Sequence, residues 1–86
     1  PAHAAPIQEP SRLFRAYQAH RLMREAWVLK AVESTGGSAD ELLPVAYADT
    51  RPEVFPIARL SLLAHLEKLV VEGKVREQDG RYHLRA

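Results

Sequence analysis

The stretch SLLAHLEKLVVEGKVREQDGRYHLR, residues 61–85, gives the clearest indication of a fold. In its first half apolar residues recur at three- and four-residue steps, which predicts a helix with one buried face. The recurring residues are Leu62, Leu66, Leu69 and Val70. Gly73 marks the end of this helix, because glycine readily adopts the left-handed conformation of a helix stop. Asp79-Gly80 then provides the positive-φ pair of a tight turn between two short strands.

Two more helices are expected upstream of this stretch. A long first helix near residues 11–35 carries a stripe of apolar residues and is ended by Gly36-Gly37. Because it is long for so small a domain, we expect its first half to overhang the core. A short second helix near residues 39–47 begins after Ser38, which stands at capping-box spacing from Glu41. The third helix is expected over residues 54–72.

The order of these elements is that of a winged helix: mainly α, with three helices followed by a two-stranded wing. The agreement of the local signals with one topology supports this assignment. We expect residues 1–10 to form an arm and residues 11–86 to form the domain. The predicted core consists of Leu22, Ala26, Leu29, Val32, Leu42, Leu62, Leu66, Leu69, Val75, Tyr82 and Leu84.

Composition narrows the class of protein. The chain has 86 residues, no cysteine, and 12 basic against 11 acidic side chains, for a net charge of +1. Absence of cysteine excludes disulfides and thiolate metal sites. No run approaches the roughly 18 apolar residues of a membrane helix, and no signal peptide opens the chain, so we expect a cytoplasmic protein with no membrane partner. We expect no catalysis and no cofactor from these 86 residues alone.

Many winged helices bind DNA through the third helix, and that alternative must be weighed. Residues 31–60 carry two basic and five acidic side chains, although the DNA would lie near this region. The residues expected on the exposed face of the third helix form a mixed set: Arg59, Ser61, His65, Glu67 and Lys68. Because DNA affinity needs a basic face, we expect specific DNA binding to be absent.

The first helix carries a basic stretch. Residues 15–24 include three arginines and one histidine but no acidic residue. These side chains either form a solvated helical face or an electropositive strip that meets an acidic or phosphate-bearing surface. The residues concerned are Arg15, His20, Arg21 and Arg24.

Three segments together resemble a known domain. The segments are HRLMREAWVLKAV (residues 20–32), LLPVAYADTRPEVFPIA (residues 42–58) and SLLAHLEKLVVEGKV (residues 61–75). They are similar to the C-terminal winged-helix domain of metallo-β-lactamase-fold hydrolases of the β-lactamase-like protein 2 and glyoxalase-II-like group. The resemblance implies an accessory domain that packs on an upstream catalytic domain of the same protein and shapes access of the substrate.

The arm extends this resemblance. In the family a Gly-His-Gly loop followed by Pro-Ile ends the catalytic domain, and its histidine is a zinc ligand. PAHAAPIQEP, residues 1–10, is similar, with His3 at the ligand position and alanine in place of both glycines. The resemblance therefore implies zinc in the parent enzyme, with His3 as one ligand. The substrate stays open among a thioester, an RNA strand and a lactone.

A missing catalytic domain would leave part of the first helix without a partner. We expect Leu13, Phe14, Tyr17 and Met23 to form the apolar contact with that domain. In the chain by itself, this surface is expected to form a weak homodimer through residues 11–27. Arg15, His20, Arg21 and Arg24 would then lie at the edge of the substrate cleft or between the domains.

Overall fold

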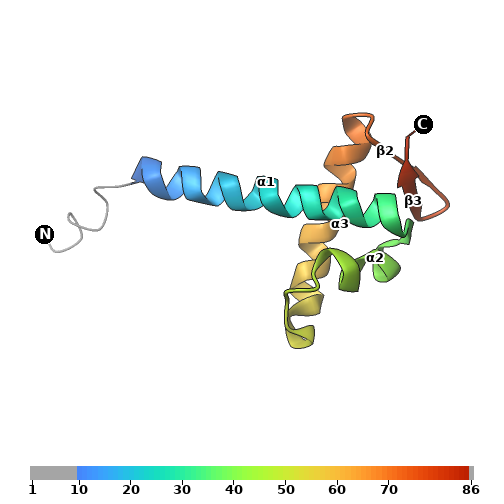
Figure 1. The fold of residues 1–86 in the computed structure, drawn as a ribbon, viewed down its shortest axis with the longest axis horizontal. Coiled ribbons are helices and arrows are strands. Elements are labelled where there is room, and N and C mark those ends of the chain that lie inside the picture. The colour runs from blue at the N-terminus through green and yellow to red at the C-terminus, as the bar shows by residue number, and fades with distance from the viewer. Residues whose placement is uncertain (1–9, 86) are drawn as a thin grey trace, which may run out of the picture.

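The computed structural model describes residues 10–85, which form three α-helices and a small antiparallel sheet (Figure 1). His3 and the rest of the proposed arm up to residue 9 lie outside the described residues. The elements in chain order are α1 (Pro10–Ser34), β1 (Gly37–Ser38), α2 (Ala39–Ala46), the 3-10 helix η2 (Pro52–Val54), α3 (Phe55–Val71), β2 (Val75–Gln78) and β3 (Arg81–Leu84). The prediction of a mainly helical winged-helix fold is confirmed.

The helices end where local chemistry predicts. Gly36 and Gly37 follow α1 with φ of 63° and 110°, and the Gly36 amide donates to the Ala31 carbonyl at 3.2 Å. At the start of α2, the Glu41 amide donates to Ser38 Oγ, and the Ser38 amide donates to Glu41 Oε1. This reciprocal pair is the predicted capping box. Pro44 lies inside α2.

The sheet has one strand more than predicted. β2 and β3 form the expected hairpin, and its turn residues Asp79 and Gly80 have φ of 53° and 77°. The short strand β1 pairs with the other edge of β3, with Gly37 opposite Tyr82, so the strand order is β1-β3-β2. A strand of two residues is too short to show a sequence period. It forms only because the hairpin lies beside Gly37 and Ser38.

The core lies where α1, α2 and α3 cross (Figure 1). Six of the predicted core residues are buried there: Val32, Leu42, Leu62, Leu66, Leu69 and Val75. Leu29 and Tyr82 are partly buried and pack against this cluster. Residues that the sequence pattern missed complete the core: Val28, Ala31, Ala39, Leu43, Ala46, Tyr47 and Ala58.

The buried face of α1 differs from the predicted one. Leu22 and Ala26 are exposed, and Val28 and Ala31 are buried in their place. At 3.6 residues per turn, Leu22 and Ala26 lie about 120–160° around the helix from Val28. Because α1 is apolar on several sides, the period alone did not select the face that packs. Leu84 was also wrongly placed in the core; it ends β3 at the margin of the core and is 40% exposed.

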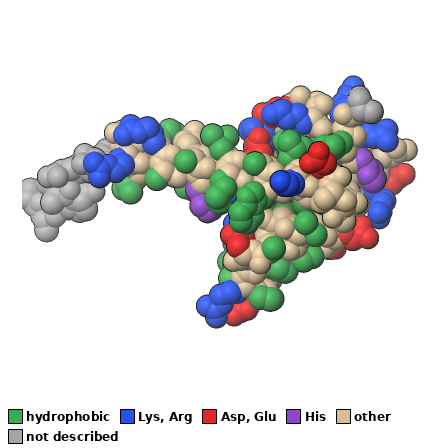
Figure 2. Space-filling model, in the orientation of Figure 1, with side chains coloured by type: hydrophobic (Ala, Val, Ile, Leu, Met, Phe, Trp, Pro, Cys, Tyr) green, Lys and Arg blue, Asp and Glu red, His purple; other side chains and the backbone are tan. Residues whose placement is uncertain are grey.

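The first half of α1 extends beyond the core. Residues 11–23, called the overhang below, are all exposed, and Figure 1 shows them projecting away from the other helices. The molecule accordingly measures 53 × 30 × 18 Å. Hydrophobic side chains occur along the overhang in Figure 2. No helix among the described residues has the length and apolar character needed to cross a membrane.

Candidate functional site

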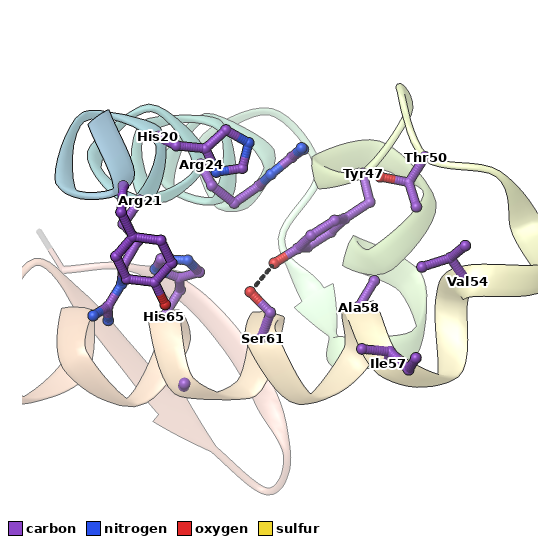
Figure 3. Close-up of a pocket in the computed structure, with 12 residues that line it drawn as sticks. His20, Arg21, Arg24, Tyr47, Thr50, Val54, Ile57, Ala58, Ser61 and His65 are labelled. Atoms are coloured by element: carbon purple, nitrogen blue, oxygen red, sulfur yellow. Dashed lines mark hydrogen bonds between the residues drawn. The ribbon is translucent and has the colours of Figure 1, made fainter. Parts of the chain in front are cut away.

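A hollow of about 520 Å³ lies in the angle between the overhang and α3 (Figure 3). The segment that follows α2 contributes Tyr47, Thr50 and Val54 to its lining. Its polar lining is Tyr17, His20, Arg21, Arg24, Tyr47, Thr50, Ser61 and His65, and its apolar lining is Val54, Ile57, Ala58 and Ala64. This volume is in the range of small-molecule sites. We call this site the hollow.

Arg24 forms the inner wall of the hollow and is only 7% exposed. Its guanidinium donates to the Ala46 carbonyl at 2.8 Å and makes two bonds to the Asp49 carboxylate at 2.9 and 3.0 Å. It also stacks on Tyr47 and Trp27, at 4.5 and 4.8 Å from the ring centres. The interpretation of Arg24 as part of an exposed basic strip is therefore wrong. The side chain joins α1 to the end of α2.

Arg24 lowers the pKa of the carboxylate that it contacts. The hydrogen bonds from the Arg24 guanidinium hold the pKa of Asp49 below its usual value. Next to this pair the Tyr47 hydroxyl donates to Ser61 Oγ at 2.8 Å, the contact drawn in Figure 3. Tyr47 and Ser61 are 14 positions apart, so no local sequence signal could have predicted their hydrogen bond.

His65 faces the hollow from α3 and is buried, although the sequence pattern placed it on the exposed face. Burial lowers the pKa of the imidazole, since the charged form loses its hydration. Glu25 opposes this effect from a distance of 3.9 Å between its Oε1 and Nδ1 of His65. Glu25 also accepts from Lys68 at 2.9 Å, which ties α1 to α3.

His20 and Arg21 line the outer part of the hollow, and both are exposed. Figure 3 shows Arg21 extending from α1 toward α3, with the His20 ring close to α1. The Arg21 guanidinium lies 5.9 Å from the centre of the Tyr17 ring. Arg15 is exposed too, but it is six residues from Arg21 and so about 120° away around the helix. The structure therefore brings His20, Arg21 and Arg24 together and leaves Arg15 outside the hollow.

The proposed apolar contact residues do not share one face. Leu13, Phe14 and Tyr17 are each more than 60% exposed, and they continue the line of the buried residues Val28 and Ala31 along α1. Met23 is nine residues from Phe14 and lies on the opposite side of the helix. It is 39% exposed. The grouping of Met23 with Phe14 on one face is therefore wrong.

The exposed large side chains of α3 are apolar rather than basic. They include Leu60, Val71 and Ile57, which also lines the hollow. The two α3 residues that carry a permanent positive charge are paired: Arg59 with Asp40 at 2.9 Å, and Lys68 with Glu25 and Glu72. A face of this kind lacks the cations that neutralise phosphates in a DNA groove.

Residues 10–85 contain no group of three or more His, Asp or Glu side chains that could hold a metal ion. The part of the chain that the structure describes does not by itself fit zinc. The proposed ligand His3 lies outside it.

Comparison with known families identifies the domain. The family model of the beta-lactamase associated winged helix domain matches residues 38–82, which is 45 of the 86 residues. The matched range runs from the α2 cap through α3 and into β3, and it leaves α1 outside. The chain belongs to the beta-lactamase associated winged helix domain family.

Proposed function

We propose that this chain is the accessory domain of a zinc-dependent metallo-β-lactamase-fold hydrolase. It packs on a catalytic domain of the same protein and shapes access of the substrate, and it supplies no catalytic residue from residues 10–85. Membership of a family described as beta-lactamase associated supports the pairing with such a domain. Zinc belongs to the catalytic domain in this proposal.

The overhang carries the proposal. Leu13, Phe14 and Tyr17 extend the buried face of α1 beyond the core and remain exposed. Each such side chain stabilises a fold by about 1.5–3 kcal/mol when it is buried. A contiguous apolar surface of this kind marks a protein contact. We infer that the catalytic domain covers this face.

The position of the hollow supports a role in substrate access. It lies beside Tyr17, so a domain docked on the overhang would stand next to its open side. His20 and Arg21 would then lie at the edge of the cleft between the domains. Arg24 would act from behind them, as the residue that fixes α1 against α2.

The first test is the coding sequence that precedes Pro1. We expect it to encode a metallo-β-lactamase fold with an HxHxDH motif. A different upstream domain would refute the assignment to a hydrolase.

The second test measures the contact. The catalytic domain, produced separately, is added to the chain, and hydrogen exchange is followed along α1. We expect residues 11–24 to become protected, and Phe14→Asp with Tyr17→Asp to abolish this protection. Leu22→Asp is the matched control, because Leu22 is equally exposed but lies about 140° around the helix from Tyr17. Unchanged exchange in the wild type would contradict the proposed docking surface.

A further inference from the structure

The hollow has an unbalanced charge. None of its twelve lining residues is an aspartate or a glutamate. Arg24 is neutralised by Asp49, but no described carboxylate lies within ion-pairing distance of Arg21, which lies over the Tyr17 ring. His20, the preceding residue of α1, also lines the hollow. An unpaired guanidinium at the mouth of a concave site can bind a carboxylate or a phosphate through two parallel hydrogen bonds.

Arg21 contrasts with the other cations near the helix crossing. Arg24, Arg59 and Lys68 each contact a carboxylate of this chain at 2.9 Å. These pairs hold the elements together, and their charges are satisfied within the fold. Arg21 lies on the same α1 face as Arg24, three residues earlier, yet it has no such partner among the described residues. Its charge is therefore available to a molecule from outside.

The hollow also offers a hydroxyl donor and an apolar wall. Ser61 Oγ accepts from Tyr47, and no described residue accepts a hydrogen bond from Ser61, so its hydroxyl proton can be donated into the hollow. Val54, Ile57 and Ala64 form a wall that can contact an apolar body. Figure 3 shows Ser61 on α3 facing the side from which His20 and Arg21 extend.

We propose that the hollow binds an organic anion, a carboxylate or a phosphate monoester carried on a compact apolar body. Arg21 and His20 hold the anionic group, Ser61 donates a hydrogen bond, and the wall formed by Val54, Ile57 and Ala64 receives the apolar part. The volume of about 520 Å³ fits a molecule of this size. This names the ligand chemistry of the substrate-access surface proposed above, but binding by the chain itself does not depend on the hydrolase assignment.

The experiment is an NMR titration of the 86-residue chain with phenyl phosphate and phenylacetate. We expect saturable shifts at the amides of Arg21 and Ser61. Two further probes separate the contributions of charge and apolar contact: inorganic phosphate lacks the apolar body, and benzyl alcohol lacks the charge. Both should bind at least about tenfold more weakly than phenyl phosphate. Equal binding of benzyl alcohol and phenyl phosphate would overturn the anion site, and equal binding of inorganic phosphate would overturn the role of the apolar wall.

Variants test the residue that carries the proposal. Arg21→Gln should weaken binding of phenyl phosphate about tenfold, since a charge-assisted hydrogen bond is lost. Arg21→Lys should retain part of the affinity because it keeps the charge without the planar fork. Arg15→Gln is the matched control: the same side chain is removed from the same helix, outside the hollow, and affinity should not change. If Arg21→Gln binds as the wild type does, the proposal fails.

Experiments on the parent protein distinguish two sources of the anion, a free ligand and an acidic side chain of the catalytic domain. If the hollow serves a free ligand, the parent protein should show the same phenyl phosphate shifts as the isolated chain. If an acidic side chain of the catalytic domain fills it, the parent should show none, and Arg21→Gln should weaken the association of the two domains. A third outcome is that the parent shows no phenyl phosphate shifts and that Arg21→Gln does not weaken the association of the two domains. With binding intact in the isolated chain, this outcome would refute the cleft-edge role of Arg21 but not the anion site.

Discussion

Arg24 is the residue on which the junction of α1 and α2 depends. A buried guanidinium is stabilising only when its donors are satisfied, and here the Ala46 carbonyl and the Asp49 carboxylate satisfy them. The rings of Trp27 and Tyr47 add cation–π contacts. A residue that looks like one of several surface arginines in the sequence is thus part of the interior.

Replacing Arg24 tests this assignment. Arg24→Met keeps much of the apolar packing but leaves the Ala46 carbonyl without a partner, so we expect the free energy of unfolding to fall by about 2–3 kcal/mol. Urea denaturation measures the change. Arg15→Met, on the exposed overhang, should change stability by no more than about 0.5 kcal/mol. Similar effects of the two variants would show that the contacts of Arg24 add no more to the free energy of unfolding than an exposed arginine does.

His65 makes stability depend on pH. Its pKa in the folded state is lowered, first by burial and then by the charges of Arg21, Lys68 and Arg24, although Glu25 opposes the shift. The unfolded chain therefore binds a proton at a higher pH than the folded chain does. Stability from this group is complete above the unfolded pKa of about 6.5 and declines as pH falls toward the folded pKa.

The corresponding measurement is urea denaturation at pH 7.5, 6.5 and 5.5. We expect the wild type to lose stability across this range and His65→Gln to lose less. His20→Gln, which removes an exposed imidazole, should behave as the wild type does. A wild-type profile as flat as that of His65→Gln would refute the burial effect.

At the scale of elements, α2 is held at its start by side chains and backbone within four residues. The reciprocal bonds of Ser38 and Glu41 satisfy two amides that the helix itself cannot satisfy. Arg81 of β3 also contacts Glu41 at 3.2 Å, so the cap links the helix to the wing. The pKa of Glu41 is lowered by the backbone hydrogen bond from Ser38 and then by Arg81.

Ser38→Ala removes the side-chain half of this cap. We expect a loss of about 1 kcal/mol in the free energy of unfolding, the usual effect of losing an N-cap. Ser34→Ala, at the other side of the Gly36-Gly37 link, removes two long 3.4 Å contacts, to the Ala31 carbonyl and to Thr35 Oγ1, and should be nearly neutral. Thermal unfolding of both variants measures the difference. Equal stability of Ser38→Ala and Ser34→Ala would show that the Ser38 side chain does not stabilise α2.

The chemistry of α3 bears on the DNA-binding alternative. Because Arg59 and Lys68 are paired and Ile57, Leu60 and Val71 are exposed, we expect no sequence-specific DNA complex. Gel shifts with a pool of random duplexes, selected over several rounds, provide the measurement. Enrichment of one sequence would establish sequence-specific DNA binding, which this face does not favour.

The whole molecule is a small core with an overhang along one helix. Its longest dimension, 53 Å, is nearly three times its shortest. This shape exposes Leu13, Phe14 and Tyr17 together on one face while the rest of the chain forms a closed core. A partner that docks in the angle between the overhang and α3 can contact both helices at once.

In the absence of a catalytic domain, we expect the chain to form a weak homodimer through the overhang. Sedimentation at several concentrations should show self-association that Phe14→Asp with Tyr17→Asp abolishes. Salt should strengthen it, because screening weakens the repulsion between the arginines of two overhangs. A wild-type chain that stays monomeric at every concentration, with α1 folded, would contradict this prediction.

The sequence by itself determined the features that depend on neighbouring residues. Gly36-Gly37, the Ser38 cap, Gly73 and the Asp79-Gly80 turn set the ends of the helices and the hairpin, and the fold class followed from their order. The overhang was predictable as well, since its length exceeds what the core can cover. His20 and Arg21 were found as site candidates because charge and spacing are visible in a linear chain.

The tertiary structure decided which side of each helix is inside. In α1, apolar residues occur on several sides, and only packing against α2 and α3 selected Val28 and Ala31 over Leu22 and Ala26. Burial of Arg24 and His65 had the same origin, because their partners Asp49 and Glu25 are 25 and 40 positions away in the chain. A local pattern cannot report such contacts, since the free energy that selects a buried face comes from residues distant in sequence.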